Sequence, residues 1–377
     1  MRSLQSGESK AGTFGFRLLF ACMGARGQTY NGRMVRFGGG FVAGVALLGC
    51  AMCFGQPPAA EKSDHNAAEQ DTALSQASSL VQQGKLAEAE RAVQQYLTTH
   101  ASSADGHYLL GSIYFQEVHE KAAVPGGAEF EYSNPGVVDA KFKDGKAKAS
   151  LTEYTEGAKY RVPGAVELKV VAFDYILLGD YPDADKWLTR ALQSTPEDAE
   201  GWYYLGRTKY NENRFEEAIE DFQRCLKMDG ANLRAEYNLG LAYQGLGRMD
   251  DAVAAFRSAI ARQEHKLNQD AEPFIDLGSL LLDENRLQEA LPYLLKAVAI
   301  SPQEFRAHEQ LGRAYERLDQ LEKAQAEFEK AVALAPQNPR LHYVLGQVYR
   351  KEGLAEKAKL ELDRSSALRR DTPSEGR

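Results

Sequence analysis

The sequence predicts an all-α fold built as a solenoid of antiparallel helix pairs, and three observations support this prediction. A set of large and small apolar residues recurs about every 34 residues through the chain. Polar turn sequences fall at one fixed offset within each repeat, and proline falls at another. The composition, with 44% hydrophobic and 26% charged residues, suits a helical array in water, and no period-two strand pattern competes with it.

Each repeat contains two amphipathic helices. The large residues stand at helical spacing, so each helix buries one stripe against its neighbours. Glycine inside a helix costs about 1 kcal/mol relative to alanine, so its recurrence at repeat position 8 indicates two helices that cross too closely for larger side chains. The successive copies are Trp202, Leu205, Gly206, Ala218 and Phe222; Leu239, Gly240, Tyr243, Ala252 and Phe256; Leu277, Gly278, Ala290 and Leu294; Leu311, Gly312, Tyr315, Ala324 and Phe328; and Leu345, Gly346, Tyr349, Ala358 and Leu362.

The ends of the helices follow the same register. Pro196, Pro302 and Pro336 stand at repeat position 32, where the second helix should stop. Polar turns separate the two helices within a repeat, as helix hairpins require. These turns are Asn211 to Asn213, Gly245 to Gly247, Asp283 to Asn285 and Lys351 to Gly353.

The pattern resembles the tetratricopeptide repeat, whose motif is W-x2-L-G-x2-Y, then A-x3-F, then a small residue and proline. The resemblance implies a right-handed superhelical solenoid of about eight units over residues 70–372, with a polar tail at 373–377. Because each repeat buries its core against its neighbours, one solenoid is expected in place of several globular domains. We expect repeats to begin near 70, 104, 165, 199, 233, 271, 305 and 339, and the first of these to cap the array.

One repeat is interrupted. Leu110, Gly111 and Tyr114 supply a first helix, but no matching second helix is expected before about Ser150, with Tyr154 following. The insertion at about 117–146 contains two Pro-Gly clusters and is interpreted as a loop or small hairpin. Two roles stay open for it: a tolerated surface excursion, or a contact loop that packs its aromatic residues into the groove.

The N-terminal part follows a different pattern. Phe37 to Phe54 is an uncharged stretch of 18 residues that follows Arg33 and Arg36, which is typical of an export signal. Translation beginning at Met34 would leave residues 1–33 as an extension of the gene, residues 34–55 as the signal or anchor, and 56–69 as a polar linker. Leu47 to Cys50 resembles a bacterial lipobox, although Leu48 stands where that motif prefers a smaller residue. Lipidation of Cys50, ordinary cleavage and retention as a membrane anchor all remain open.

Residues for catalysis or metal binding do not gather in any known constellation. His107, His308 and His342 all stand at repeat position 4, a whole repeat or more apart, where they replace a large packing residue. Cys50 and Cys53 lie in the apolar signal segment, and Cys225 fills a small-residue core position. We therefore expect no enzyme activity, no cofactor and no metal.

The charge balance favours protein partners. The chain carries a net charge of −8, and removal of residues 1–55, with six basic and one acidic residue, leaves 39 basic against 52 acidic residues, or −13. That balance opposes generic binding to nucleic acid. The expected partners are proteins or peptides, contact with a membrane is expected only through the N-terminal segment, and the oligomeric state stays open.

In the resembled family, ligands lie in a concave groove lined by the first helices. Tyrosine, phenylalanine and arginine are the residue types that most often carry binding energy, although the same residues could instead pack between repeats or solubilise the groove. The groove positions hold aromatic residues toward the N-terminus and arginines toward the C-terminus. The candidate partner-binding residues are Tyr108, Phe115, Phe173, Tyr203, Arg207, Tyr210, Arg234, Tyr237, Arg306, Arg313, Arg340, Tyr343 and Arg350.

Two specialised members of the family do not fit. The chaperone-binding type resembles a carboxylate clamp that Phe173 and Tyr204 would break here, and the sugar-transferase type has an asparagine ladder represented only by Asn238. The sequence thus predicts a nonenzymatic scaffold that binds extended peptides or proteins, exported to the periplasm or tethered to a membrane. The alternatives are an accessory subunit of an envelope enzyme or secretion complex that uses the 117–146 insertion, and a cytoplasmic adaptor.

Overall fold

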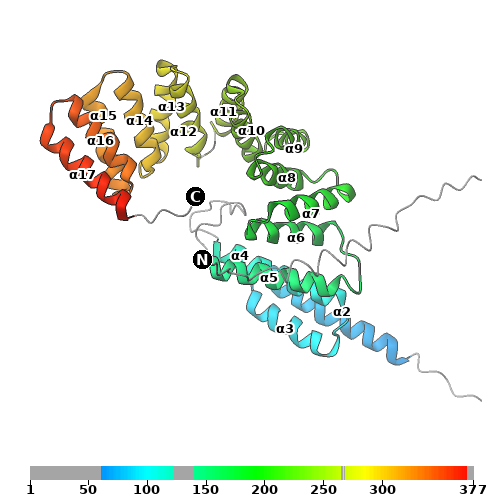
Figure 1. The fold of residues 1–377 in the computed structure, drawn as a ribbon. Coiled ribbons are helices and arrows are strands. Elements are labelled where there is room, and N and C mark those ends of the chain that lie inside the picture. Colours follow the sequence, from blue (N-terminus) through cyan, green and yellow to red (C-terminus); the bar gives the residue numbers. More distant parts are fainter. Residues whose placement is uncertain (1–60, 123–138, 265, 267, 372–377) are drawn as a thin grey trace, which may run out of the picture. The chain divides into compact units, whose positions relative to one another are not determined.

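The structure is a computed structural model that describes residues 61–122, 139–264, 266 and 268–371, with no side chains described for residues 61–71, 122 and 371. Within these ranges it consists of helices joined by turns, which confirms the predicted all-α fold (Figure 1). The early helices are α2 (Glu61–Gln82), α3 (Leu86–Thr99), α4 (Ala104–Ala122), α5 (Ala140–Gly157), α6 (Ala165–Leu178) and α7 (Tyr181–Ser194). They are followed by α8 (Ala199–Asn211), α9 (Phe215–Met228), α10 (Leu233–Gly245), α11 (Met249–Gln263), α12 (Glu272–Asp283), α13 (Leu287–Ile300), α14 (Phe305–Arg317), α15 (Leu321–Leu334), α16 (Pro339–Lys351) and α17 (Ala355–Asp371).

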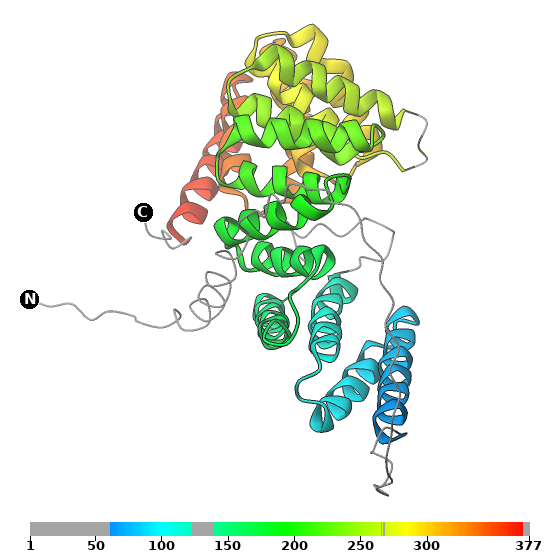
Figure 2. The ribbon, with the colours of Figure 1, turned by 90° about the vertical axis from the view of Figure 1, so that its right-hand side faces the viewer.

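The chain divides into two units. Unit 1 comprises the described residues of Met1–Gln116 and Ala149–Val162, and unit 2 those of Glu117–Lys148 and Pro163–Arg377. In unit 2, each even-numbered helix from α6 to α16 pairs with the helix that follows it (Figures 1 and 2). The second helix of each pair up to α15 then packs on the first helix of the next pair. Consecutive hairpins therefore bury their apolar stripes against one another, as repeat packing requires.

The turn inside each hairpin needs one residue with a left-handed backbone. Glycine adopts this conformation at Gly84, Gly179, Gly247 and Gly353, whose φ angles are 72°, 75°, 74° and 79°. Asn213, Asn285 and Asp319 adopt it with φ angles of 59°, 60° and 57°. All seven stand at the same repeat position, and asparagine and aspartate are the side chains that tolerate this region best. The turn chemistry therefore ends the first helix at the same place in these seven repeats.

The glycines at repeat position 8 lie where the two helices of a hairpin cross. A Cβ atom added to Gly206 would lie 2.7 Å from Cε1 of Phe222, and one added to Gly240 would lie 2.7 Å from Cδ1 of Phe256. Both phenylalanines are fully buried. Glycine is thus required by close packing at these sites, as the sequence pattern predicted.

The prediction of a loop or hairpin for residues 117–146 is wrong at both ends of that segment. Helix α4 continues to Ala122, and α5 begins at Ala140, well before Ser150. The two extensions contact each other through an ion pair between Lys146 and Glu117 and through Lys121, whose Nζ lies 3.6 Å from the centre of the Phe142 ring. Neither extension contains proline, so no residue in them stops a helix. The Pro-Gly clusters lie outside the described residues.

The first helix also starts earlier than expected. Helix α2 begins at Glu61, inside the segment predicted as a polar linker. Its first ten residues contain neither proline nor glycine, so nothing in them stops a helix. Among the described residues, no helix is long and apolar enough to cross a membrane. The predicted signal segment at 34–55, Cys50 and the tail at 373–377 lie outside the described residues.

Candidate functional site

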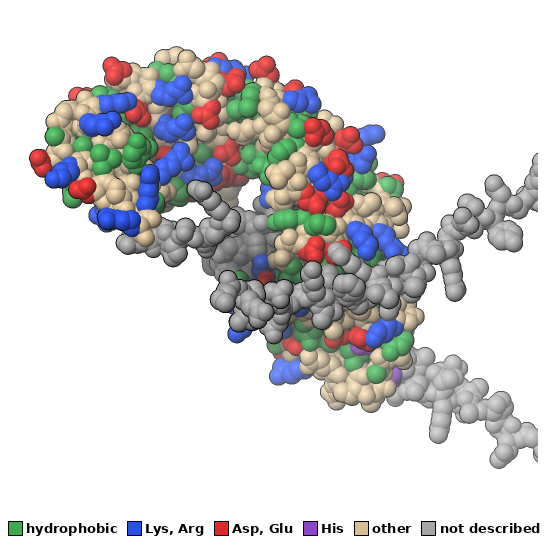
Figure 3. Space-filling view, viewed as in Figure 1, with side chains coloured by type: hydrophobic (Ala, Val, Ile, Leu, Met, Phe, Trp, Pro, Cys, Tyr) green, Lys and Arg blue, Asp and Glu red, His purple; other side chains and the backbone are tan. Residues whose placement is uncertain are grey.

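The first helices of unit 2 share one surface, which we call the first-helix face. It consists of the outward side chains of α6, α8, α10, α12, α14 and α16, and Figure 1 shows α8, α10 and α12 on the inner side of the arc that their hairpins follow. Polar contacts join neighbouring first helices across this face, and basic and acidic side chains are interspersed over unit 2 in the space-filling view (Figure 3). The face therefore carries side chains that do not pack the hairpin cores.

The centre of the first-helix face is a cluster from three consecutive first helices. The hydroxyl of Tyr237 on α10 donates to Oδ2 of Asp276 on α12 over 2.5 Å. Arg306 on α14 donates to Oδ1 of the same carboxylate over 2.9 Å and to Glu272 over 2.5 Å. Burial, followed by the Asp276 carboxylate, raises the pKa of Tyr237, so the phenol remains a hydrogen-bond donor at neutral pH.

Burial also raises the pKa of Glu272, against the opposing attraction of Arg306. The cluster thus contains two carboxylates and one guanidinium in a half-buried setting. Such an arrangement holds the three helices in register, because each partner would be left partly desolvated and unpaired if a helix moved.

The same kind of contact recurs along the face. Toward the N-terminus, Lys169 Nζ lies 2.9 Å from Asp198 and 2.9 Å from Glu200, Arg207 donates to Asn238, and the Arg234 guanidinium lies 4.9 Å from the centre of the Tyr203 ring. Toward the C-terminus, Arg313 pairs with Asp283 at 3.2 Å, Arg340 with Glu309 at 3.1 Å and Lys351 with Glu316 at 2.7 Å. Each contact joins one first helix to the next first helix or to the residue that caps that helix. We call this row of contacts along unit 2 the polar seam.

The structure divides the predicted binding residues into two groups. Tyr108, Phe115, Phe173 and Tyr203 are buried, with Tyr203 only 1% exposed, so they present no surface to a partner in this structure. Tyr108 and Phe115 also belong to unit 1. Their burial follows from edge and stacking contacts with neighbouring rings, such as Phe173 with Tyr204 at 4.7 Å.

The remaining predicted residues keep exposed surface. The partly buried members are Arg207, Tyr210, Arg234, Tyr237, Arg306 and Arg313, and the exposed members are Arg340, Tyr343 and Arg350. Most of the arginines already bond to neighbours, which the sequence did not reveal. The acidic partners Asp276, Asp283 and Glu309 carry no local signal, because each meets an arginine about one repeat away in sequence.

The histidines at repeat position 4 make a recurrent polar contact that the packing interpretation missed. In α14, His308 Nδ1 lies 2.6 Å from Glu327 and Nε2 lies 3.1 Å from the carbonyl oxygen of Pro302. His342 repeats this with Glu361 and Pro336, at 2.5 and 2.9 Å. Trp202 Nε1 donates to the equivalent carbonyl of Pro196. In these three repeats position 4 therefore ties the first helix to the end of the preceding repeat. Among the described residues, no group of histidine, cysteine and acidic side chains could hold a metal ion.

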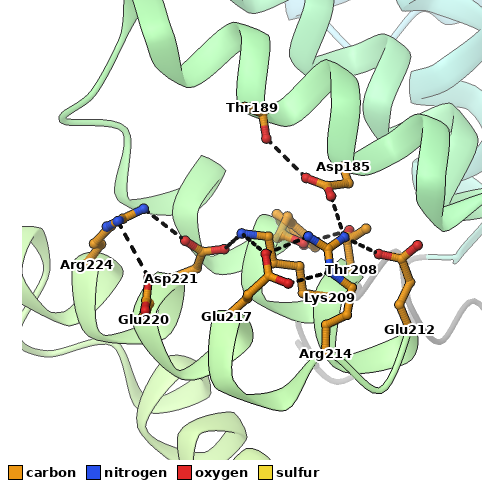
Figure 4. Close-up of polar contacts among 11 residues, drawn as sticks. Asp185, Thr189, Thr208, Lys209, Glu212, Arg214, Glu217, Glu220, Asp221 and Arg224 are labelled. Carbon is orange, nitrogen blue, oxygen red and sulfur yellow. Dashed lines mark hydrogen bonds and ion pairs between the residues drawn. The ribbon is translucent and has the colours of Figure 1, made fainter.

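A second polar cluster holds α7, α8 and α9 together (Figure 4). Arg214 donates to both oxygens of Glu217, over 2.8 and 2.6 Å, and to Asp185 over 2.6 Å. Lys209 lies 2.6 Å from Asp221, which is 1% exposed. Burial raises the pKa of Asp221 even though Lys209 and Arg224 favour the carboxylate. The network fixes one repeat against the next and is not part of the first-helix face.

Comparison with known families agrees with the repeat pattern. Models described as tetratricopeptide repeat match residues 74–124, 232–303 and 305–348. A model described as anaphase-promoting complex, cyclosome, subunit 3 matches residues 178–259. Together with the helix hairpins, the repeat matches show that the chain belongs to the tetratricopeptide-repeat proteins.

Several curated proteins resemble parts of the chain. The peroxisomal targeting signal receptor of Saccharomyces cerevisiae is 32% identical over 111 residues, which cover 29% of this chain and 17% of that protein. A PEX5-related protein of Homo sapiens is 34% identical over 82 residues, covering 22% and 13%. The cytochrome c-type biogenesis protein CycH of Pseudomonas aeruginosa is 27% identical over 122 residues, covering 31% and 28%. The chain thus spans less than a third of each of these relatives.

Solved structures with helical repeats also match. YrrB, titled a tetratricopeptide-repeat protein with an unusual peptide-binding site, has a TM-score of 0.42 and 24% identity over 49% of this chain and 93% of its own. The Cut9-Hcn1 hetero-tetramer of the anaphase-promoting complex has a TM-score of 0.47 and 15% identity over 82% of this chain and 55% of its own.

Proposed function

We propose that this protein is a nonenzymatic scaffold whose first-helix face in unit 2 binds an extended segment of a partner protein. The observation that carries the proposal is that large arginine and tyrosine side chains on that face keep exposed surface. These residue types offer large contact area with a directional polar group. The polar seam holds the first helices in register, so the face needs little reordering when a partner binds.

The comparison with the yeast receptor supports a peptide ligand, because that relative is named as a receptor for a targeting signal. The similarity covers a repeat segment only. We therefore propose only that the ligand is a segment of a protein. Recognition of a peroxisomal signal is attributed to the yeast relative and is not proposed for this chain.

Site-specific photo-crosslinking tests the proposal. Tyr343 on the first-helix face and Leu295 on the second helix α13 are both 44% exposed, so a photoreactive amino acid at either position meets solvent to the same degree. In the cells of origin, partners captured at Tyr343 and absent at Leu295 are the expected result. Equal capture at the two positions, identified by mass spectrometry, would contradict a ligand on the first-helix face.

We also propose that the chain is exported. The support is the basic-then-apolar segment before the repeats, with Cys50 as the candidate lipidation site. Cell fractionation and mass spectrometry of the native N-terminus test this: a lipid on Cys50, a cleaved end after the apolar segment or an uncleaved chain in the membrane each support export. An uncleaved protein in the cytosolic fraction would favour the cytoplasmic adaptor.

One comparison favours a second function, an accessory component of an assembly in the cell envelope. The support is that the relative CycH is named as a cytochrome c-type biogenesis protein. In that case the crosslinks at Tyr343 should converge on a single stoichiometric partner. Diverse partners would instead support a general adaptor.

A further inference from the structure

The middle of the first-helix face contains an uncharged stretch. Helix α10 and the turn after it carry no charged residue from 237 to 247, and α12 carries none from 277 to 282. Four partly exposed side chains of the face lie in or beside these runs, and we call them the neutral gap. They are Tyr210 on α8, Leu241 and Gln244 on α10, and Ser279 on α12.

The neutral gap interrupts the polar seam. Two of its members stand at repeat position 9, where in a later repeat Arg313 pairs with Asp283 of the preceding first helix at 3.2 Å. In the part of the chain that the structure describes, the hydroxyls of Tyr210 and Ser279 and the amide of Gln244 make no hydrogen bond. A ligand can therefore bond to these groups without displacing a protein partner.

One aromatic ring brings the ends of α8 and α10 together. The ring of Phe215, at the start of α9, has its centre 5.4 Å from the centre of the Tyr210 ring. A Cβ atom added to Gly245, the residue after Gln244, would lie 2.8 Å from Cε1 of the same ring. Tyr210 and the last turn of α10 therefore lie against a shared neighbour.

The hydroxyl of Tyr210 also lies within electrostatic range of α12. Burial raises the pKa of Tyr210, while Arg207 opposes this change and Asp276 on α12 adds to it. The phenol therefore stays a hydrogen-bond donor at neutral pH. Asp276 stands one turn before Ser279, so the neutral gap runs across three consecutive first helices as one stretch of the face.

The charged groups at the border of the neutral gap are already bonded. Arg207, one turn before Tyr210, donates to Asn238. Asp276 accepts from Tyr237 and from Arg306. A charged ligand side chain placed on the gap would lose water without gaining an ion partner, which is costly. An uncharged ligand group avoids this cost.

From this we infer that the neutral gap binds an uncharged stretch of the partner segment, bonds to its main chain and packs Leu241 against an apolar side chain. The inference rests on the proposed function and names the chemistry of the ligand at the middle of the face. An extended segment has no internal hydrogen bonds, so its main-chain N–H and C=O groups need partners when it binds. The Gln244 amide and the Ser279 hydroxyl each both donate and accept, and can therefore satisfy either group.

Peptide selection on the full chain supplies the probe. Peptides selected from a random library displayed on phage should share a stretch of uncharged residues. The best of them should bind wild type about tenfold more tightly than the variant Gln244→Ala/Ser279→Ala, because the variant loses two hydrogen bonds to the ligand. The unfolding midpoint of the variant should match wild type, because neither side chain has a hydrogen bond to lose within the described structure.

Ester substitution in the selected peptide tests whether the main chain is the target. An ester replaces one main-chain N–H with oxygen and so removes a single donor. At least one ester in the uncharged stretch should weaken binding to wild type severalfold. The same ester should not weaken binding to Gln244→Ala/Ser279→Ala, because the acceptor of that bond is already missing.

A matched control makes the same two changes on second helices. Gln288 on α13 and Ser258 on α11 also make no hydrogen bond in the described structure, so Gln288→Ala/Ser258→Ala should bind the peptide as wild type does. The inference is overturned if the two double variants bind equally, if the esters weaken binding to both wild type and Gln244→Ala/Ser279→Ala, or if no selected peptide prefers wild type. Each of these results leaves the proposed function to the crosslinks at Tyr343, which do not depend on the chemistry of the neutral gap.

Discussion

The close crossing of α8 and α9 predicts a specific energetic cost for enlarging Gly206. In Gly206→Ala, the new Cβ would lie 2.7, 2.8 and 3.1 Å from three ring carbons of Phe222. Optimal carbon contacts lie near 3.5 Å, so the ring must move by about 0.8 Å. Phe222 is fully buried, so no empty space receives it. Overpacking of this kind costs about 1–3 kcal/mol.

Alanine also favours the helix, by about 0.5–1 kcal/mol over glycine. Gly145, inside α5, isolates that contribution because a Cβ atom added there would meet no neighbouring atom within 4 Å. Gly145→Ala should therefore stabilise the protein by that amount. The free energies of unfolding of the two alanine variants should differ by the overpacking cost alone, about 1–3 kcal/mol, in urea denaturation followed by circular dichroism.

A second substitution identifies the ring as the cause. The repeat at 165 has Ala172 at position 8, and its partner position holds Leu188 where the next repeat has Phe222. Phe222→Leu should accordingly relieve Gly206→Ala, giving a favourable coupling energy of about 0.5 kcal/mol or more in a double-mutant cycle. The reasoning is refuted if Gly206→Ala stabilises the protein as Gly145→Ala does, or if the two changes add independently.

Four further outcomes follow from buried groups and turn geometry. Lys209→Met leaves the buried Asp221 carboxylate without its nearest cation, so it should lower the free energy of unfolding by about 3–5 kcal/mol in urea denaturation at pH 7. The double variant Lys209→Met/Asp221→Leu should recover most of that loss. An equal loss in both variants would contradict the ion-pair assignment. Burial already raises the pKa of Asp221 in the folded state, so as the pH falls the folded form takes up the proton before the unfolded form does. The Lys209→Met variant should therefore regain stability as the pH falls from about 7 to 5. A loss of stability over that range would show that the carboxylate is not buried. Burial raises the pKa of the Cys225 thiol to about 12, so a thiol reagent should modify it in urea and not in native protein at neutral pH, and rapid native labelling would show that the α9 core opens. Asp319 has a left-handed backbone with a φ angle of 57°. Asp319→Ala should therefore lower the free energy of unfolding by about 1 kcal/mol, while Asp319→Gly should not lower it. Equal effects of the two substitutions would mean that the turn does not impose this backbone conformation.

The fold was predictable because its signals are local and periodic. The contact between Gly206 and Phe222 joins residues of one hairpin, and the left-handed turn residues are glycine or asparagine in most repeats. A fixed period lets each copy support the assignment of the others. The ends of the insertion were missed because the helices there have no repeat partner, and their extension depends on contacts such as Lys146 with Glu117.

The candidate site was less predictable because its contacts join different repeats. Tyr237 meets Asp276, and Arg340 meets Glu309, across neighbouring first helices. Position within a repeat identifies the residues that lie on the first-helix face, but pairing depends on how one hairpin stacks on the next. The same dependence explains Tyr203, which stands at a groove position yet is buried by neighbouring aromatic rings and by Arg234.

This difference determines which substitutions report on binding. Removing the ring of Tyr203 would open a cavity in a close-packed core, so lost binding could reflect lost folding. Arg306 poses the same problem, because its removal would leave two partly buried carboxylates facing each other. Tyr343 and Arg350 are exposed and do not carry the polar seam. Changes at these two residues therefore test the first-helix face as a binding surface while its architecture stays intact.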